Sequence, residues 1–385
     1  MRILIVGSDS NAYTLARTFS NDDNVDLIFV TTGNKYITSD IAQTTDICET
    51  DNEELLNFAN ANEITLTVVT SLKAIENDIA GYFSGSGRNI FAPTSESAYE
   101  SLYTSACKKT LYKLHIPTVK FGVFDRENQA VNYVSDSRKI SVIKYDSNSD
   151  NIPPILVNSF SQAKREIEKA FVLPETKIVI EDYFNAKEVC IYFITDGYSA
   201  LMAGSCSVFD ECSYSVYSPD NVLSDEIISD IQQRVVYPYI NYCEANNRPY
   251  NGILGVNLLI SDEEYKVLDF CPFFKQVHLQ SILPSVKNNI ADLFLSVAVG
   301  SFSDEYNNID FSNRCSYSEI LSSKEIKRNL SEYDDDNFFY SRNSNGNVII
   351  TETASTYSGA KSRCGYAAEY LTTVNTEIFP EESDE

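Results

Sequence analysis

The stretch that most constrains the fold is residues 249–280, PYNGILGVNLLISDEEYKVLDFCPFFKQVHLQ. An apolar run of strand length, 253–260, precedes a second strand, 265–270, and residues 261–264 between them are typical of a tight acidic turn. Side chains alternate between the two faces of a strand, so Asp269 and Cys271 leave the second strand on one face. A carboxylate at the end of an apolar strand is costly to bury without a partner. The pattern is equally compatible with a metal or cation site and with a hydrogen-bonded structural aspartate.

The first 70 residues alternate strands with helices. Apolar strands at 2–6, 26–31 and 64–69 flank helical patterns near 12–19 and 53–60. This alternation predicts a parallel sheet with right-handed crossovers. Ligands bind such sheets at the carboxyl ends of the strands, so the loops at 7–11 and 70–73 are candidate contacts. The dinucleotide motif G-x-G-x-x-G does not follow the first strand, which argues against NAD.

Composition narrows the class of protein. The chain has 385 residues, 43% of them hydrophobic, which predicts two or three globular domains. A net charge of −25 argues against nucleic acid and anionic membrane surfaces as partners. No apolar run reaches membrane-spanning length, and MRILIVGSDS is typical of a strand, not of a signal peptide. Nine cysteines without a C-x-x-C pair favour reduced thiols and a cytoplasmic location.

The pattern changes after residue 93. A helical run at 95–114 precedes strands at 139–144 and 177–181, with an amphipathic helix at 161–171 between them. This arrangement predicts a small antiparallel unit that is distinct from the first sheet. A long helix at 223–246, the hairpin described above and a helix at 288–299 follow. Residues 310–378 have the pattern of a small α+β unit, and the chain ends in the acidic PEESDE.

Seven stretches, in this order along the chain, resemble glycinamide ribonucleotide synthetase (phosphoribosylamine–glycine ligase), an ATP-grasp enzyme family of purine synthesis. They are MRILIVG, NIFAPTSESAYESLYTSACKKTLYKLHIPTV, KIVIEDYFNAKEVCIYFITDG, YSPDNVLSDEIISDIQQRVVYPYI, YNGILGVNLLI, YKVLDF and NSNGNVIITETASTYSGAKSRCGYAAEYL. The resemblance covers nearly the whole chain. It implies an α/β fold with an N-terminal parallel α/β domain at 1–92, an ATP-grasp core at 93–119 and 196–296, an inserted lid at 120–195, and a C-terminal α+β domain with an acidic tail at 297–385.

The resemblance also implies a reaction and a site. The family makes an acyl phosphate from glycine and ATP, which an amine then attacks, so ATP and magnesium are the implied cofactors. The implied nucleotide contacts are Lys108, Lys144, Glu181, Asp182, Tyr183, Phe184 and Glu188. Asp269 stands where the family has a magnesium-binding glutamate, and the implied substrate loop contains Gly7, Ser8 and Asn11. Each residue also has a structural alternative, such as a solvated Lys144 or an exposed Glu188.

Several positions depart from the family pattern. Thr104 replaces an ATP-contacting lysine, Cys271 an asparagine that binds magnesium, and Phe273 an arginine. The glycine-rich loop after Lys144 reads YDSNSDN, without glycine and with two aspartates. Further changes fall at 275–278 (KQVH in place of Gly-Asp-Pro-Glu), at 209–216, where a glycine-rich loop is shortened, and at 9–13 (DSNAY in place of Gly-Gly-Arg-Glu-His).

Two classes of function are therefore predicted side by side. The first is an ATP-dependent carboxylate–amine ligase, with the original substrates or with changed ones. The second is a catalytically inactive homologue that acts as a binding or scaffolding protein. In either case we expect a cleft bordered by Lys144, Glu181 and Glu188 that faces Asp269, with weak or absent binding of magnesium-ATP. We also expect no useful rate of glycine ligation. The expected partner is a small-molecule substrate or an unidentified protein.

Overall fold

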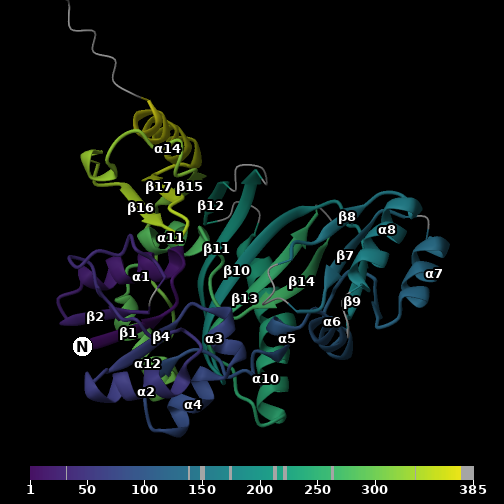
Figure 1. Ribbon diagram of the computed structural model, residues 1–385, viewed down its shortest axis with the longest axis horizontal. Coiled ribbons are helices and arrows are strands. Elements are labelled where there is room, and N and C mark those ends of the chain that lie inside the picture. Colours follow the sequence, from purple (N-terminus) through teal and green to yellow (C-terminus); the bar gives the residue numbers. More distant parts are fainter. Residues whose placement is uncertain are drawn as a thin grey trace, which may run out of the picture.

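The computed structural model describes residues 1–31, 33–137, 139–147, 152–172, 176–210, 215–219, 223–261, 264–333 and 335–373. In these residues the strands form a five-stranded, an eight-stranded and a four-stranded sheet (Figure 1). The fold is α/β, as the sequence predicts. No helix in the described ranges combines the length and the apolar character needed to cross a membrane.

The N-terminal sheet is parallel, with strand order β3-β2-β1-β4-β5. Its strands are β1 (Arg2–Val6), β2 (Leu27–Val30), β3 (Gln43–Thr44), β4 (Leu66–Val69) and β5 (Ile90–Phe91). Its helices are α1 (Ser10–Ser20), α2 (Asn52–Ala61), α3 (Leu72–Glu76) and α4 (Ile79–Gly85). Ile3 and Ile5 pack in one core with α1, whereas Leu4 and Val6 pack in another with α2, α3 and α4. The predicted parallel sheet is confirmed.

The eight-stranded sheet has the order β14-β13-β10-β11-β12-β15-β17-β16. Its strands are β10 (Lys187–Asp196), β11 (Ala200–Asp210), β12 (Ser215–Ser218), β13 (Asn251–Ile260), β14 (Tyr265–Cys271), β15 (Cys315–Leu321), β16 (Phe338–Arg342) and β17 (Val348–Ala354). The predicted hairpin is confirmed as β13 and β14, with Asn257 opposite Asp269 and Gly255 opposite Cys271. Residues 262 and 263 of the predicted turn lie outside the described residues.

One long helical segment packs on the face of this sheet that carries Leu254, Val256 and Leu258. It comprises α9 (Asp225–Ile231), the π-helical turn η1 (Gln232–Val236) and α10 (Tyr237–Ala245). On the opposite face, Ile253 packs in the core shared with the N-terminal sheet, whereas Asn257 and Asp269 belong to the charged network described below.

The four-stranded unit, residues 121–182, is antiparallel and has the order β6-β9-β7-β8. Its elements are β6 (Phe121–Phe124), α7 (Glu127–Ser137), β7 (Ser141–Tyr145), β8 (Ile155–Val157), α8 (Phe160–Ala170) and β9 (Ile178–Asp182). Apolar side chains of β7, β9 and both helices form its own core. The range 120–195 expected for the lid also includes β10, which instead pairs with β11 and β13 in the large sheet.

The helical run expected at 95–114 is divided. It forms α5 (Tyr99–Leu102) and α6 (Thr104–Lys113), and Tyr103 between them is extended, with φ −125° and ψ 115°. Tyr103 makes an isolated β-bridge with Ser147 of the four-stranded unit. The N–H of Thr104 donates to the carbonyl of Asp146 at 2.9 Å. These tertiary contacts interrupt a helix that local propensity alone would continue.

The C-terminal part contributes to two layers of the molecule. Its helices are α11 (His278–Ile282), η2 (Leu283–Ser285), α12 (Ile290–Val299), α13 (Phe302–Glu305), η3 (Leu330–Glu332) and α14 (Tyr357–Thr372). α12 packs against the N-terminal sheet, where Phe294 stacks on Phe91 with ring centroids 3.9 Å apart. β15, β16 and β17 extend the large sheet through the pairing of β12 with β15, and α14 covers these strands (Figure 1).

Candidate active site

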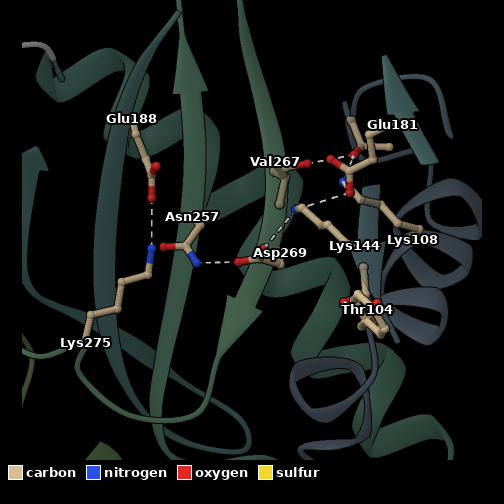
Figure 2. A network of polar contacts seen from close by, with 11 residues as sticks. Thr104, Lys108, Lys144, Glu181, Glu188, Asn257, Val267, Asp269 and Lys275 are labelled. Carbon is tan, nitrogen blue, oxygen red and sulfur yellow. Dashed lines mark hydrogen bonds and ion pairs between the residues drawn. The ribbon is translucent and has the colours of Figure 1, made fainter. Parts of the chain in front are cut away.

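Lys144 lies at the centre of a charged network between the four-stranded unit and the large sheet (Figure 2). Its Nζ atom is 3.2 Å from Oε1 of Glu181 on β9 and 3.5 Å from Oδ2 of Asp269 on β14. The lysine side chain is only 11% exposed. Burial alone would lower the pKa of Lys144, but the two carboxylates outweigh it and raise that pKa above its usual value. Lys144 is therefore a permanent cation that links the four-stranded unit to the large sheet.

Lys108 supports this network from α6. Its side chain is fully buried, and its Nζ lies 3.2 Å from Oε1 of Glu181. The ammonium also donates to Oγ1 of Thr118 at 3.1 Å, and Thr118 donates in turn to the carbonyl of Val267 at 2.7 Å. Burial lowers the pKa of Lys108, and Glu181 opposes that shift. Glu181 thus receives two lysines, and Lys108 connects three parts of the chain.

Asp269 has a second partner that the sequence analysis did not single out. Asn257, on the adjacent strand, donates its side-chain amide to Oδ1 of Asp269. Burial favours the protonated form of Asp269, but Lys144, Lys275 and this amide lower the pKa below its usual 3.8. Asn257 is only 4% exposed, and its own Oδ1 has no hydrogen-bond partner among the described residues. The NH₂ group of Asn257 thus points towards Asp269 and its orphaned amide oxygen points away, and both side chains carry hard oxygen ligands.

Cys271 does not complete a metal site. A hydrogen bond with Cys190 and burial raise the pKa of Cys271 well above its usual value, so the thiol is protonated at neutral pH. A neutral thiol is a poor ligand for a hard cation. The described residues contain no group of three or more His, Cys, Asp or Glu side chains that could hold a metal. Any divalent cation here would depend on Asp269, Asn257 and oxygens of its ligand.

Glu188 lies on β10 and pairs with Lys275, whose Nζ is 2.9 Å from Oε1 of the glutamate. Both residues line a cavity of about 920 Å³, whose described lining does not include Lys144 or Asp269. The backbone N–H of Lys275 donates to the hydroxyl of Tyr192 at 3.1 Å, and that hydroxyl is also hydrogen-bonded to Nδ1 of His278 at 2.8 Å. Burial and Lys275 lower the pKa of His278 to about 3, so its imidazole is neutral. Residues 275–278, which replace the family's Gly-Asp-Pro-Glu run, therefore line this cavity.

Asp146 lies at the start of α6. Its carboxylate accepts from the N–H of Ser105 at 2.7 Å and from the Ser105 hydroxyl at 3.1 Å. Lys177 pairs with the same carboxylate at 3.1 Å. An acidic side chain is favourable at the positive end of a helix dipole. Residues 148–151, the rest of the altered loop after Lys144, lie outside the described residues.

The implied nucleotide contacts Asp182, Tyr183 and Phe184 lie where β9 is connected to β10. The N–H groups of Asp182 and Tyr183 donate to the carbonyls of Lys120 and Ile140, at 2.9 and 3.1 Å. These two N–H groups are thus engaged inside the four-stranded unit. The Asp182 side chain pairs with Lys139 at 3.2 Å, the Tyr183 side chain is exposed and that of Phe184 is partly exposed.

The N-terminal loop lies apart from this network. The N–H of Gly7 donates to Oγ1 of Thr31 at 2.9 Å, and Asn11 donates to the carbonyl of Phe274 at 2.7 Å. Asp9 caps α1 by accepting from the N–H of Ala12, and burial raises the pKa of Asp9 to about 6. Ser8 is partly exposed beside Gly33. Gly7 and Asn11 thus use these groups for hydrogen bonds with other residues of the protein.

The structure therefore brings Lys108, Lys144, Glu181 and Asp269 into one network. Glu188 lies on β10, separated from β14 by β13, and Gly7, Ser8 and Asn11 lie in the N-terminal loop. The sequence analysis did not identify Asn257. The signal that could have found it is a polar side chain inside the apolar run ILGVNLLI. A buried amide needs partners, and Asn257 lies directly across the hairpin from Asp269.

A parallel α/β sheet, a large antiparallel sheet and a small antiparallel unit that contributes a lysine to the cleft between them together define the ATP-grasp class of proteins. The sequence model for the N domain of phosphoribosylglycinamide synthetase matches residues 1–99, and the model for the ATP-grasp (A) domain of the same family matches residues 104–278. The chain belongs to the phosphoribosylglycinamide synthetase family.

Relatives with the corresponding name agree with this assignment. The phosphoribosylamine–glycine ligase of Lactococcus lactis is 26% identical over 311 residues, which is 78% of this chain and 76% of that protein. The enzyme of the same name from Caldanaerobacter subterraneus is 23% identical over 315 residues, or 78% of this chain and 75% of the relative.

Solved structures show the same fold. Phosphoribosylamine–glycine ligase from Thermotoga maritima superposes with a TM-score of 0.76 at 14% identity and covers 96% of both chains. The biotin carboxylase domain of 2-oxoglutarate carboxylase from Hydrogenobacter thermophilus, solved with MgADP, gives 0.74 at 13% identity and covers 95% of this chain and 89% of that one. At these identities the structural likeness establishes the fold alone. The family models confirm the resemblance inferred from the sequence.

Proposed function

We propose that this protein is an ATP-dependent carboxylate–amine ligase whose substrates differ from those named for its relatives. The observation that carries the proposal is the convergence of Lys144, Glu181, Asp269 and Asn257 in one network. Phosphoryl transfer requires a positioned cation and hard oxygen ligands around the triphosphate. The network provides both kinds of group, Lys144 from the four-stranded unit and Asp269 with Asn257 from the large sheet.

Lys144 and Lys108 have distinct roles in this proposal. Lys144 is partly accessible and holds its charge between two carboxylates, so it can exchange a carboxylate contact for a nucleotide phosphate. Lys108 is fully buried beneath Glu181 and acts as a positioning residue that fixes that carboxylate. Glu188 lies at the opposite wall, where it would accept hydrogen bonds from ribose hydroxyls after separation from Lys275.

Asp269 and Asn257 are the residues that fit a magnesium ion. Magnesium is commonly bound through one or two protein oxygens, with phosphates and water completing its coordination. The orphaned Oδ1 of Asn257 supplies the amide oxygen that position 271 no longer offers. When bound there, the ion would neutralise charge on the phosphates. The two side chains would position it, and Asn257 would turn its oxygen in place of its NH₂ group towards the site.

The substrate positions support a change of substrate. Asp9 and Asn11 are used to cap α1 and to hold the carbonyl of Phe274. A carboxylate at position 9 also has the wrong charge for a phosphoribosyl group. We therefore expect no useful rate of ligation of glycine to phosphoribosylamine. Expression in cells that lack the synthetase, grown without purines, tests this expectation. Growth that Lys144→Ala abolishes would overturn it.

Calorimetric titration with ATP, with and without magnesium, tests the proposed cleft. We expect binding weaker than micromolar, because each lost charge-assisted phosphate contact costs about 1.5–3 kcal/mol. Asn257→Leu should remove the magnesium dependence of binding, whereas Asn257→Asp should retain it. Lys164→Met, on the exposed face of α8, is the matched control. Catalysis is then measured as ADP release with a panel of carboxylic acids and amines.

A second function, a noncatalytic binding protein, is favoured by one specific observation. Lys275 pairs with Glu188, and Asp146 occupies the start of α6, so these groups already have partners within the chain. ATP binding that is insensitive to magnesium and to Asn257→Leu, together with no ADP release, would support this alternative and refute the ligase.

A further inference from the structure

A second cavity, of about 580 Å³, lies between the N-terminal sheet and the C-terminal strands. Its walls are α1, the segment 35–41 that follows β2, and residues of η3 and β16. Figure 1 shows α1 beside the C-terminal strands and well away from the four-stranded unit. None of the residues around Lys144 lines it. Its volume is in the range of sites for small molecules.

The charge of this cavity is opposite to that of the whole protein. The chain has 30 Lys and Arg against 55 Asp and Glu. The described lining, however, carries three cations, Arg17, Lys35 and Arg342, and a single carboxylate, Asp40. No ion pair involving these three cations is formed within the described parts of the chain. In a strongly acidic protein, such a concentration of unpaired positive charge favours an anionic ligand.

Tyrosine rings hold the cations in place. The guanidinium carbon of Arg17 lies 4.2 Å from the ring centroid of Tyr340. That of Arg342 lies 5.0 Å from the centroid of Tyr36, and Nζ of Lys35 lies 5.2 Å from the same centroid. A guanidinium that stacks on a ring keeps its N–H edge available for a second partner. The rings therefore orient the cations without neutralising them.

The two walls are fixed to each other. Asn34 donates its side-chain amide to the carbonyl of Arg342 at 2.8 Å. At Gly346, a Cβ atom would lie 2.4 Å from the hydroxyl of Tyr36, and the backbone φ is +84°, so this close approach requires glycine. Contacts between residues about 300 positions apart in sequence thus form the cavity before any ligand binds. Such preorganisation reduces the entropic cost of binding.

We propose that this cavity binds a small phosphate monoester, of the size of a sugar phosphate or a mononucleotide, at a site separate from the cleft around Lys144. Two guanidinium groups and one ammonium group match a phosphate dianion, because arginine binds phosphate oxygens in pairs. Burial and the neighbouring Tyr340 raise the pKa of Tyr13 to about 12, so its hydroxyl remains a hydrogen-bond donor on the same wall. The ligand would contact the N-terminal sheet and the C-terminal strands together.

Calorimetric titration of the full chain with ribose 5-phosphate, AMP and adenosine tests the proposal. Ribose 5-phosphate, AMP or both should bind, adenosine should not, and inorganic phosphate should compete. A comparison of AMP with ribose 5-phosphate shows which of the two the site prefers. Arg17→Met and Lys35→Met should each weaken binding about tenfold or more, the value for one lost charge-assisted contact. Lys35 is exposed, so Lys35→Met keeps the test valid if Arg17→Met does not fold.

Two control variants separate this cavity from other cations. Lys113, whose Nζ is 4.7 Å from the ring centroid of Tyr242, is a similar cation–ring pair on a distant helix. Lys113→Met should leave binding unchanged. Lys275→Met alters the cleft and should also leave it unchanged, which keeps this test independent of the proposed ligase activity. No binding of either phosphate probe, or binding lost in Lys275→Met and kept in Arg17→Met and Lys35→Met, would overturn the proposal.

Discussion

The pairing of Lys144 with Asp269 can be measured directly by a double-mutant cycle. The cycle compares Lys144→Met, Asp269→Asn and the double variant with the wild-type chain. Each single variant leaves a charged partner in a mostly buried site, where the two side chains are 11% and 27% exposed. We expect each to lower the free energy of unfolding by about 3 kcal/mol. The double variant should be destabilised by less than the two single effects combined.

The size of the coupling follows from the geometry. Two unit charges 3.5 Å apart attract by about 5 kcal/mol at an effective dielectric constant near 20. Lys144 shares its charge with Glu181, and solvent partly screens Asp269, so we expect a measured coupling of about 2 kcal/mol. The folded-state pKa of Asp269 is lowered and that of Lys144 is raised. The coupling should therefore be constant from about pH 5 to pH 9 and disappear as the pH falls through the lowered pKa of Asp269.

Urea unfolding at pH 7, followed by circular dichroism, gives the four free energies. The matched control is the exposed pair Lys164–Glu168 on α8, with an N–O distance of 3.6 Å and side chains 50% and 49% exposed. The cycle of Lys164→Met and Glu168→Gln should give a coupling of only about 0.3–0.5 kcal/mol. A coupling between Lys144 and Asp269 as small as this would refute the account of the network.

Three further predictions concern the rest of the molecule. Gly255→Ala should lower the free energy of unfolding by about 1–3 kcal/mol, measured in urea, because a Cβ would lie 2.2 Å from Sγ of Cys271; an unchanged stability would contradict this. Arg248→Met should cost about 3–5 kcal/mol, since it leaves the 3% exposed carboxylate of Glu100 unpaired, and a loss below about 1 kcal/mol would refute it. Burial raises the pKa of Glu352 to about 7, so stability should fall as the pH rises through that value. Glu352→Gln should then raise the melting temperature at pH 8 more than at pH 5. An equal effect at the two pH values would contradict this prediction.

Elements that depend on local pattern could be predicted from the sequence. The parallel N-terminal sheet follows from the alternation of strands and helices, and the β13–β14 hairpin follows from two apolar runs around a turn. The break at Tyr103 could not, because the contacts that cause it come from Asp146 and Ser147, more than 40 residues away. Helix propensity depends on the local sequence, so it cannot predict a contact of this kind.

Individual residues of the site could be predicted from the sequence, but their arrangement in space could not. Lys144 and Asp269 were singled out separately, but their approach requires the four-stranded unit to pack against the large sheet. The role of Asn257 depends on the register of the hairpin, which shifts at an irregularity between Asn257 and Leu258. A shift of one residue would place its amide on the opposite face of the sheet. Register of this kind is set by the packing of the whole sheet.

The continuity of the eight-stranded sheet also determines which parts of the molecule can move. One ladder of backbone hydrogen bonds runs from β14 at the cleft to β16 beside the second cavity, so the two sites are built on the same rigid body. A hinge between them would have to break the pairing of β12 with β15. The four-stranded unit has its own ladder and shares no strand with that body in the described residues. We therefore expect any movement of Lys144 relative to Asp269 to be a movement of this unit about the connections that precede β6 and follow β9.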